Sequence, residues 1–273
     1  MPELPELQAH AERLTAGWGG NVLRKFTPLS FTAMKTAVPP AKDALDHPLV
    51  KVGRRGKYLL LDFETLTFAV HLMQGGRLKP DAKQAVKVRG GIARWVFDDR
   101  SALLLTEAGK EHRAGVWTDP EVATAGLGPE ADQVSAEELA KLFSDHSMRL
   151  HGFLRDQGCI AGLGRRLANE VCHRAKISPF ASTSKLGIEG AEAVVLAIHE
   201  CVDESLAYER SRDDMSSSAD RPGAVHHRKG DACPVCGDTV REVSYSAYTV
   251  NYCPTCQTGG KVLADNTTSK FLK

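Results

Sequence analysis

The order of apolar and polar positions predicts a helix followed by β-strands in the first part of the chain. Residues 5–14 are amphipathic, with Pro5 at the first helical position and Glu6 in the first turn, as is typical of a helix start. Short runs with alternating or β-branched residues follow. They predict two β-hairpins, formed by residues 57–63 with 67–72 and by residues 92–97 with 102–106. We therefore predict a β-rich domain with a leading helix.

The pattern changes to a helical period further along. Residues 118–134 contain Pro, Gly and acidic residues without periodicity, which indicates a linker. Ser135, with Glu138 three residues later, has the sequence of a capping box and predicts a helix start. Helical spacing then continues, with interruptions, to about Arg210. A turn at residues 162–164 separates two predicted helices, and Pro179 is predicted to end the second.

The last part of the chain differs from both preceding parts. Residues 211–222 are polar, and a small module with four cysteines follows them. Together these patterns predict an α+β fold of three domains: a β-rich domain at residues 1–120, a helical domain at 121–222 and the cysteine module at 223–273.

Composition narrows the class of protein. Hydrophobic residues make up 42% of the 273 residues, which is enough to fill ordinary cores. No uninterrupted apolar stretch is as long as a membrane span, and the first residues lack the basic and apolar regions of a secretory signal. We therefore expect a cytoplasmic protein without a membrane partner.

The charge of one segment says more about possible partners than the net charge of the chain does. The net charge of +1 neither favours nor excludes a nucleic-acid partner. Residues 149–176 carry six basic and two acidic side chains, a local charge of +4. The basic ones are Arg149, Arg155, Arg165, Arg166, Arg174 and Lys176. Such a cluster suits phosphate contacts, because Lys and Arg displace condensed counterions, but a solvated helix face explains it equally well.

The seven cysteines fall into two groups. Three lie within apolar helical pattern and are predicted to be buried thiols: Cys159, Cys172 and Cys201. The other four form two C-x-x-C motifs separated by sixteen residues: Cys233 with Cys236, and Cys253 with Cys256. Two such motifs can direct four thiolates to one tetrahedral Zn²⁺.

Other uses of these four cysteines fit less well. Two disulfides would need an oxidising compartment, and a redox pair would need only one motif. We therefore predict one structural Zn²⁺ per chain, bound by four protein thiolates, with residues 240–252 forming a β-hairpin between the motifs. A module this small is expected to depend on the metal for folding.

The N-terminus is the second candidate for chemistry. Removal of Met1 would leave Pro2 with a free secondary amine, which can attack C1′ of a deoxyribose and form an iminium (Schiff-base) intermediate. Glu3 and Glu6 could move the protons that such a reaction needs. Taken alone, Pro and acids at a chain start also suit simple helix capping.

The N-terminus and the cysteine module occur together in one known family. The sequence resembles the bacterial family of formamidopyrimidine-DNA glycosylase and endonuclease VIII over nearly its whole length. The matching segments are MPELPE at residues 1–6, RRGKYLLL at 54–61, HL at 71–72, LGPE at 127–130, IAGLG at 160–164, RKG at 228–230 and YCPTCQ at 252–257. The resemblance implies an N-terminal β-sandwich, a helix–two-turns–helix domain and a C-terminal zinc finger.

The resemblance also implies roles for matching residues. Pro2 corresponds to the Schiff-base nucleophile, Glu3 to the acid that opens the sugar ring, and Glu6 to a supporting carboxylate. Lys57, at the start of a predicted strand, corresponds to a lysine that contacts the phosphate beside the lesion and assists β-elimination. The turn from Gly162 to Gly164 corresponds to one whose N–H groups hold a DNA phosphate at a helix N-terminus.

Two positions depart from the family pattern where phosphate is bound. Arg165 stands where the family has Asn, so the contact can be charged but with another geometry. Tyr248 stands where the zinc hairpin carries an Arg that grips phosphate near the lesion and donates a proton in δ-elimination. Because a phenol supplies no charge, we expect weaker lesion binding and a product that stops largely at β-elimination.

The side chains that would fill the void of a flipped nucleotide also differ. Gln74 stands at the position of a family Met, and His112 and Arg113 replace an Arg-Phe pair. The segment between the last helix and Arg228 is short, so we expect no long loop that caps a flipped 8-oxoguanine. These features favour the endonuclease VIII branch, whose usual substrates are oxidised pyrimidines.

The sequence thus predicts a base-excision-repair DNA glycosylase with abasic-site lyase activity, acting as a monomer on damaged double-stranded DNA. Three alternatives stay open: an abasic-site lyase or glycosylase for unusual adducts, a catalytically silent damaged-DNA-binding protein, and an unrelated enzyme carrying a zinc ribbon. The N-terminal carboxylates and Lys57 argue against the silent protein, and the zinc ribbon explains only the C-terminal module.

Overall fold

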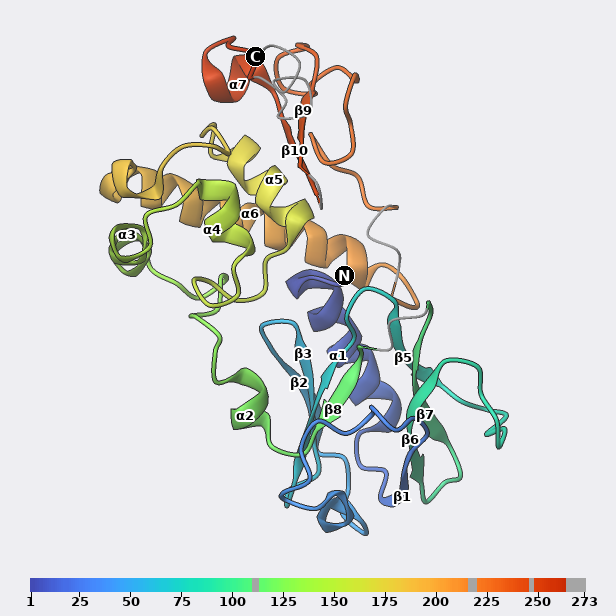
Figure 1. Cartoon of the computed structure of the whole chain (residues 1–273). Helices are drawn as coiled ribbons and strands as arrows, with labels where there is room; N and C mark the ends of the chain where they lie inside the picture. The colour runs from blue at the N-terminus through green and yellow to red at the C-terminus, as the bar shows by residue number, and fades with distance from the viewer. Residues whose placement is uncertain (110–112, 216–219, 246–247, 264–273) are drawn as a thin grey trace. The chain divides into compact units, whose positions relative to one another are not determined.

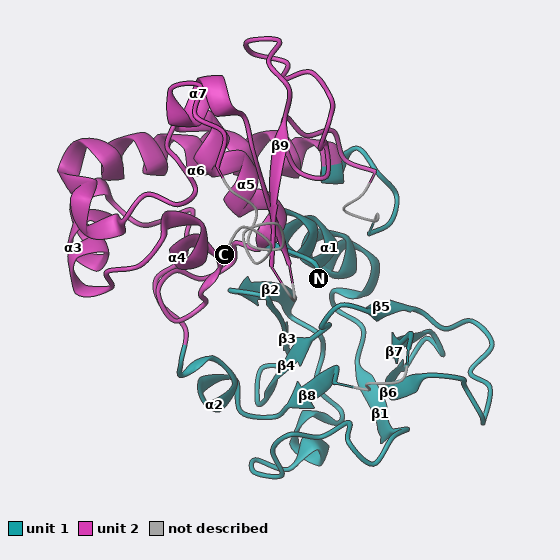
Figure 2. Ribbon diagram, turned by 45° about the horizontal axis from the view of Figure 1, so that its top comes forward, with its two compact units in different colours: residues 1–126, 209–216 teal, residues 127–208, 217–273 magenta. Residues whose placement is uncertain are grey.

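The computed structural model of the chain describes residues 1–109, 113–215, 220–245 and 248–263 (Figure 1). They form two compact units: one at residues 1–126 and 209–216, the other at 127–208 and 217–273 (Figure 2). The predicted domain boundaries at residues 120 and 222 stay predictions. No helix among the described residues is both long and apolar enough to cross a membrane.

The first unit is a β-sandwich with a leading helix. Its elements are α1 (Leu4–Trp18), β1 (Leu23–Pro28), a 3-10 turn (Ala41–Ala44), β2 (Lys51–Arg55), β3 (Tyr58–Asp62), β4 (Thr67–His71), β5 (Gly76–Pro80), β6 (Gly91–Phe97), β7 (Ala102–Glu107), β8 (Gly115–Trp117) and α2 (Pro120–Thr124). The strands form two four-stranded sheets in the orders β1-β6-β7-β5 and β2-β3-β4-β8. Leu14 of α1, Phe68 of β4 and Trp95 of β6 share one buried core, so both sheets and the helix contribute to it.

Both predicted hairpins are present in this unit. β3 pairs antiparallel with β4, Tyr58 opposite His71, and β6 pairs antiparallel with β7, Trp95 opposite Leu103. The predicted linker, by contrast, contains helix α2. Asp119 caps it, because its Oδ1 accepts from the N–H of Glu121 at 3.0 Å and of Val122 at 3.2 Å.

The second unit is helical, with a small hairpin near its end. Its elements are α3 (Ala136–Asp145), α4 (Leu150–Arg155), α5 (Arg165–Arg174), a 3-10 turn (Thr183–Lys185), most of α6 (Gly187–Arg210), β9 (Arg241–Ser244), β10 (Thr249–Tyr252) and α7 (Pro254–Thr258). Ser135 caps α3 as predicted, since its Oγ accepts from the N–H of Glu138 at 3.1 Å. α5 ends at Arg174 and not at Pro179, because the chain turns at Lys176, whose φ is 55°.

The three buried thiols and the C-terminal hairpin follow the predictions. Cys159, Cys172 and Cys201 are all buried and free. β9 and β10 pair antiparallel, with Val243 opposite Val250, within the segment predicted to form a hairpin between the C-x-x-C motifs. The fold is the predicted α+β class: a β-sandwich, a helical region and a C-terminal cysteine hairpin.

Candidate active site and metal centre

The N-terminus of α1 holds the two candidate acids at one buried point. Glu3 is the N-cap residue of α1 and is 5% exposed, while Glu6, in the first turn, is 1% exposed. The backbone N–H of Glu3 donates to Glu6 Oε2 at 3.1 Å, as in a capping box. Pro2 directly precedes this pair and is partly exposed. The helix start therefore holds the Glu6 carboxylate against the N–H of Glu3, the residue that follows the candidate nucleophile Pro2 in the chain.

Lys57 lies in the tight turn of the β2–β3 hairpin, one residue before β3 begins. Arg55 pairs with Tyr58, which leaves Gly56 and Lys57 as the turn, and Gly56 has a φ of 53°. Lys57 is 8% exposed despite its turn position. Burial, together with the charge of Lys57, lowers the pKa of His71 to about 4. His71 is therefore neutral at pH 7, and its Nδ1 accepts from the N–H of Met73 at 3.1 Å.

The residues that are candidates for filling the void lie in loops at one end of the β1-β6-β7-β5 sheet. Gln74 is exposed in the turn between β4 and β5. Arg113 is exposed just before β8, and His112 lies outside the described residues. The two loops leave the sheet together, because Gly76 of β5 pairs with Glu107 of β7. The Glu107 carboxylate accepts from the N–H of Ala114 at 2.7 Å, which holds the residue just before β8.

In the second unit, the Gly162–Gly164 turn leads into α5 with a well-defined geometry. Gly162 has a φ of 101°, which other residues rarely adopt, and Gly164 is the N-cap residue of α5. Gln157 holds the turn: its Nε2 donates to the carbonyl of Leu163 at 2.8 Å, and its Oε1 accepts from the N–H of Gly162 at 3.0 Å. Arg165, the first residue of α5, is exposed. A Gly-rich turn at a helix N-terminus with an exposed Arg is suited to an anion.

Tyr248, which carries no charge of its own, lies against a positively charged side chain. The guanidinium of Arg155, at the end of α4, lies 4.0 Å from the centre of the Tyr248 ring. Tyr248 also stacks on Tyr245 with ring centres 4.8 Å apart, and Arg149 donates to the Tyr245 hydroxyl at 2.7 Å. His151 lies on the same cluster, 6.0 Å from the Tyr248 ring centre. The hairpin end thus presents two tyrosines with two guanidinium groups, an arrangement that sequence reasoning missed.

The basic cluster of residues 149–176 is only partly available to an anion. Arg166 is buried and donates to the carbonyls of Arg221 and Pro222. Arg174 pairs with Glu200 and Glu204, at 3.0 and 2.7 Å. Burial and nearby arginines lower the pKa of His151 to about 3, so this histidine adds no positive charge at pH 7. The remaining arginines of the segment are Arg149, Arg155 and Arg165.

The four cysteines of the two motifs converge and fit a zinc ion. Cys233 Sγ lies 3.9 Å from Cys256 Sγ, and Cys236 Sγ lies 3.4 Å from Cys253 Sγ. Sulfur atoms at about 2.3 Å from a tetrahedral Zn²⁺ are about 3.8 Å apart, so these distances match the expected site. A metal here would be structural, because four thiolates leave no position for a substrate. Asp238 links the motifs, since its Oδ2 accepts from the Thr255 hydroxyl at 2.8 Å.

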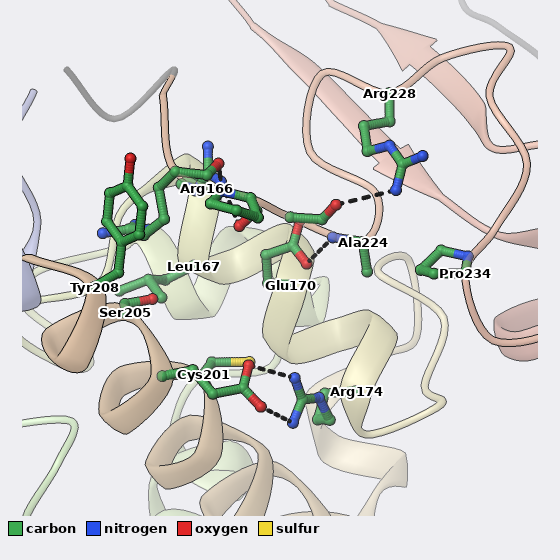
Figure 3. A pocket seen from close by; sticks show the side chains of 14 residues that line it. Arg166, Leu167, Glu170, Arg174, Cys201, Ser205, Tyr208, Ala224, Arg228 and Pro234 are labelled. Atoms are coloured by element: carbon green, nitrogen blue, oxygen red, sulfur yellow. Dashed lines mark hydrogen bonds and ion pairs between the residues drawn. The ribbon is translucent and has the colours of Figure 1, made fainter.

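One polar face of α5 holds the segment that leads to the metal site. Glu170 accepts from the backbone N–H groups of Ala224, Val225 and His226, at 2.8, 3.1 and 2.8 Å. Figure 3 shows Glu170 and Arg166 pointing from α5 toward this segment, around a cavity of about 370 Å³. The preceding residue, Asn169, is fully buried, and its Oδ1 accepts from the N–H of Asn251 in β10 at 3.2 Å. α5 therefore connects the Gly-rich turn with the cysteine module.

Comparison with known proteins agrees with this arrangement. Residues 1–110 match the formamidopyrimidine-DNA glycosylase N-terminal domain, and residues 125–217 match the H2TH domain of the same proteins. A formamidopyrimidine-DNA glycosylase of Pelotomaculum thermopropionicum is 30% identical over 284 aligned positions, covering 94% of this chain and 99% of the relative. This chain belongs to the formamidopyrimidine-DNA glycosylase family. The predicted family is therefore confirmed.

Two solved structures and one shorter relative are also similar to this chain. The formamidopyrimidine-DNA glycosylase of Thermus thermophilus has a TM-score of 0.80 at 25% identity, covering 96% of this chain and all of that one. The Lactococcus lactis enzyme, solved with DNA containing an abasic site, has a TM-score of 0.80 at 18% identity and shares the fold. An uncharacterised glycosylase-like protein of Mycobacterium tuberculosis is 46% identical over 153 residues, 54% of this chain and 94% of that protein.

Proposed function

We propose that this member of the family is a bifunctional base-excision DNA glycosylase and abasic-site lyase that uses Pro2 as its nucleophile. The observation that carries the proposal is the pair of buried carboxylates, Glu3 and Glu6, beside Pro2 at the start of α1. Acidic residues at the start of an ordinary helix are usually exposed to water. They interact favourably with the helix dipole there and need no burial to do so. Two buried acids next to a candidate nucleophile also suit proton transfer, and this combination supports the proposal.

The proposed reaction uses these groups in sequence. The Pro2 nitrogen attacks C1′ of the damaged nucleotide, and the bond from C1′ to the base breaks. Glu3 donates a proton to the ring oxygen, so that the sugar opens and the nitrogen–carbon bond becomes an iminium. Loss of a proton from C2′ then expels the 3′ phosphate, which is β-elimination. Lys57 contacts the phosphate beside the lesion, and Glu6 supports the position of Glu3.

The proposed substrate is an oxidised base, preferably a pyrimidine, in duplex DNA, and the protein is proposed to act as a monomer. Enzymes that act on a base take it out of the stack, and Gln74 and Arg113 are the proposed side chains that fill the void. Both are exposed in loops from one sheet end, as this role requires. Gly162, Gly164 and Arg165 are the proposed phosphate contacts of the second unit, together with Tyr248.

Borohydride trapping on duplex DNA with one abasic site tests the nucleophile. The native protein, with removal of Met1 verified by mass spectrometry, should form a covalent adduct, because borohydride reduces an iminium to a stable amine. A form with one extra N-terminal residue should form none, and Pro2→Gly should form far less, because its primary amine replaces a secondary one. The cleaved DNA should carry mainly the β-elimination end, not a one-nucleotide gap.

The result also separates the proposal from its alternatives. An adduct with abasic DNA but no excision of any oxidised base would leave a lyase or a glycosylase for unusual adducts. No adduct from the processed native protein, with duplex binding intact, would overturn the lyase proposal and favour a silent damage-binding protein.

Arg155 offers a second test, on DNA binding. Arg155→Ala should weaken binding to lesion duplex about tenfold and uniformly across sequences, because a guanidinium on the Tyr248 ring is lost. If that group neutralises one phosphate, the slope of log K against log salt should become less steep by about 0.9. Arg24→Ala, which removes an exposed arginine from β1, is the control. An unchanged salt slope would show that Arg155 only supports the tyrosine.

A further inference from the structure

A histidine lies against the metal site although it belongs to neither C-x-x-C motif. His173, in the last turn of α5, is 4% exposed, and its Nε2 lies 3.3 Å from Cys233 Sγ. Cys233 is itself 2% exposed. The nitrogen–sulfur distance is within the range of a hydrogen bond to sulfur, so the two side chains interact directly.

The cluster therefore contains five donor atoms, one more than a tetrahedral ion binds. Nε2 of His173 and the sulfur atoms of Cys233, Cys253 and Cys256 all lie within 4.8 Å of one another. Cys236 completes the cluster from its exposed side, 3.4 Å from Cys253. A histidine that binds metal usually donates its other ring N–H to a carboxylate, carbonyl or water. Within the described part of the chain, Nδ1 of His173 has no such protein partner.

We propose that His173 is an outer-sphere residue of the zinc site, whose Nε2–H donates a hydrogen bond to the Cys233 thiolate while four cysteines bind the metal. The electrostatic reason is the charge of the site. Four thiolates on Zn²⁺ carry a net charge of −2, and Cys233 and Cys253 are almost fully shielded from water. Buried negative charge is stable only with hydrogen-bond donors around it, and a buried imidazole N–H is such a donor.

This bond also ties the metal to α5. His173 lies on the same face of the helix as Asn169 and Glu170, at the helical spacing of three and four residues. Asn169 holds β10, Glu170 holds residues 224–226, and His173 holds the first cysteine. Metal binding and the docking of the module on α5 are therefore coupled, independently of any reaction on DNA.

Zinc affinity of the full-length protein tests the proposal. His173→Phe keeps an aromatic ring and removes the donor, and it should bind Zn²⁺ about 10- to 100-fold more weakly in competition with a chromophoric chelator. His173→Gln keeps an N–H donor and should recover most of the affinity. His199→Phe makes the same change at an exposed position of α6 and should bind Zn²⁺ like the native protein.

Cobalt substitution distinguishes the outer-sphere role from direct binding. The absorption spectrum of the Co²⁺-loaded native protein should indicate four thiolates, and the Co²⁺-loaded Phe variant should keep the same thiolate count. A native spectrum of three thiolates and one nitrogen would make His173 a ligand and overturn the proposal. Native zinc affinity in His173→Phe would also overturn it. Circular dichroism of the zinc-saturated variants verifies that each is folded.

Discussion

Replacing Cys253 by Ser is expected to abolish stoichiometric zinc binding and to unfold the cysteine module. Cys253 is fully buried, and its N–H donates to Gln257 Oε1 at 2.8 Å, so the second motif is built around it. Structural zinc contributes roughly 10–16 kcal/mol to the folding of small zinc modules at pH 7, far more than the few contacts of this hairpin can replace. The core beside the cysteines is small, with Val225 and Val240 as its buried aliphatic members.

Unfolding of the cysteine module should also destabilise α5 but should leave the β-sandwich folded. Without the module, the Glu170 carboxylate loses its three backbone donors and Asn169 loses its contact with β10. Hydrogen exchange should show lost protection in residues 224–256, while β6 and β7, in a unit with its own core, keep theirs. DNA binding should fall with the same variant, because Tyr248 is carried by the unfolded hairpin.

A matched control separates the metal effect from loss of a thiol. Cys159→Ser makes the same change at a buried free cysteine outside the metal cluster and should bind one Zn²⁺ with native affinity. Chelation of the native protein should reproduce the exchange pattern of Cys253→Ser. Native zinc affinity and native protection in Cys253→Ser would contradict the four-thiolate site.

The strands that were predicted and those that were missed differ in their place in the sheets. β3, β4, β6 and β7 are central, and their apolar runs predicted them. β1, β2, β5 and β8 are all edge strands. Their sequences give little local signal: β1 and β2 each bury one residue, β8 has three residues, and β5 contains Gly76 and Pro80. Their pairing comes from neighbours that are distant in sequence, which a local pattern does not contain.

The same distinction holds for the candidate site. Residues that act from one short segment were predicted, because spacing alone brings them together: Glu3 with Glu6, and the cysteines within each motif. Arg155 and His173 were missed as partners of the hairpin and the metal site. Each meets its partner only through packing of a helix on the C-terminal module. For His173, the sequence offered one signal: it lies at helical spacing from two other polar residues of α5, Asn169 and Glu170. Polar residues on a buried helix face need hydrogen-bond partners.

Glu3→Gln is expected to lower the excision of an oxidised base by about 10² to 10⁴-fold while sparing adduct formation with a preformed abasic site. Excision needs a proton for the sugar ring oxygen, and an amide has none to give. An abasic sugar already exists partly as the open aldehyde, so Pro2 can form the iminium without that proton. The substitution keeps the shape of the side chain. It also keeps the backbone N–H that donates to Glu6, so α1 should stay folded.

Single-turnover excision and borohydride trapping, measured on the same preparation, give this comparison. Glu12→Gln is the control, because it makes the same change on the same helix at a carboxylate that pairs with Arg210 on the surface. Loss of that exposed pair is worth at most about 1 kcal/mol of stability and should leave both reactions unchanged. Native excision by Glu3→Gln would remove Glu3 from the mechanism. Equal loss of excision and trapping would instead mean that Glu3 positions Pro2, because the damage would then lie in the nucleophile common to both reactions.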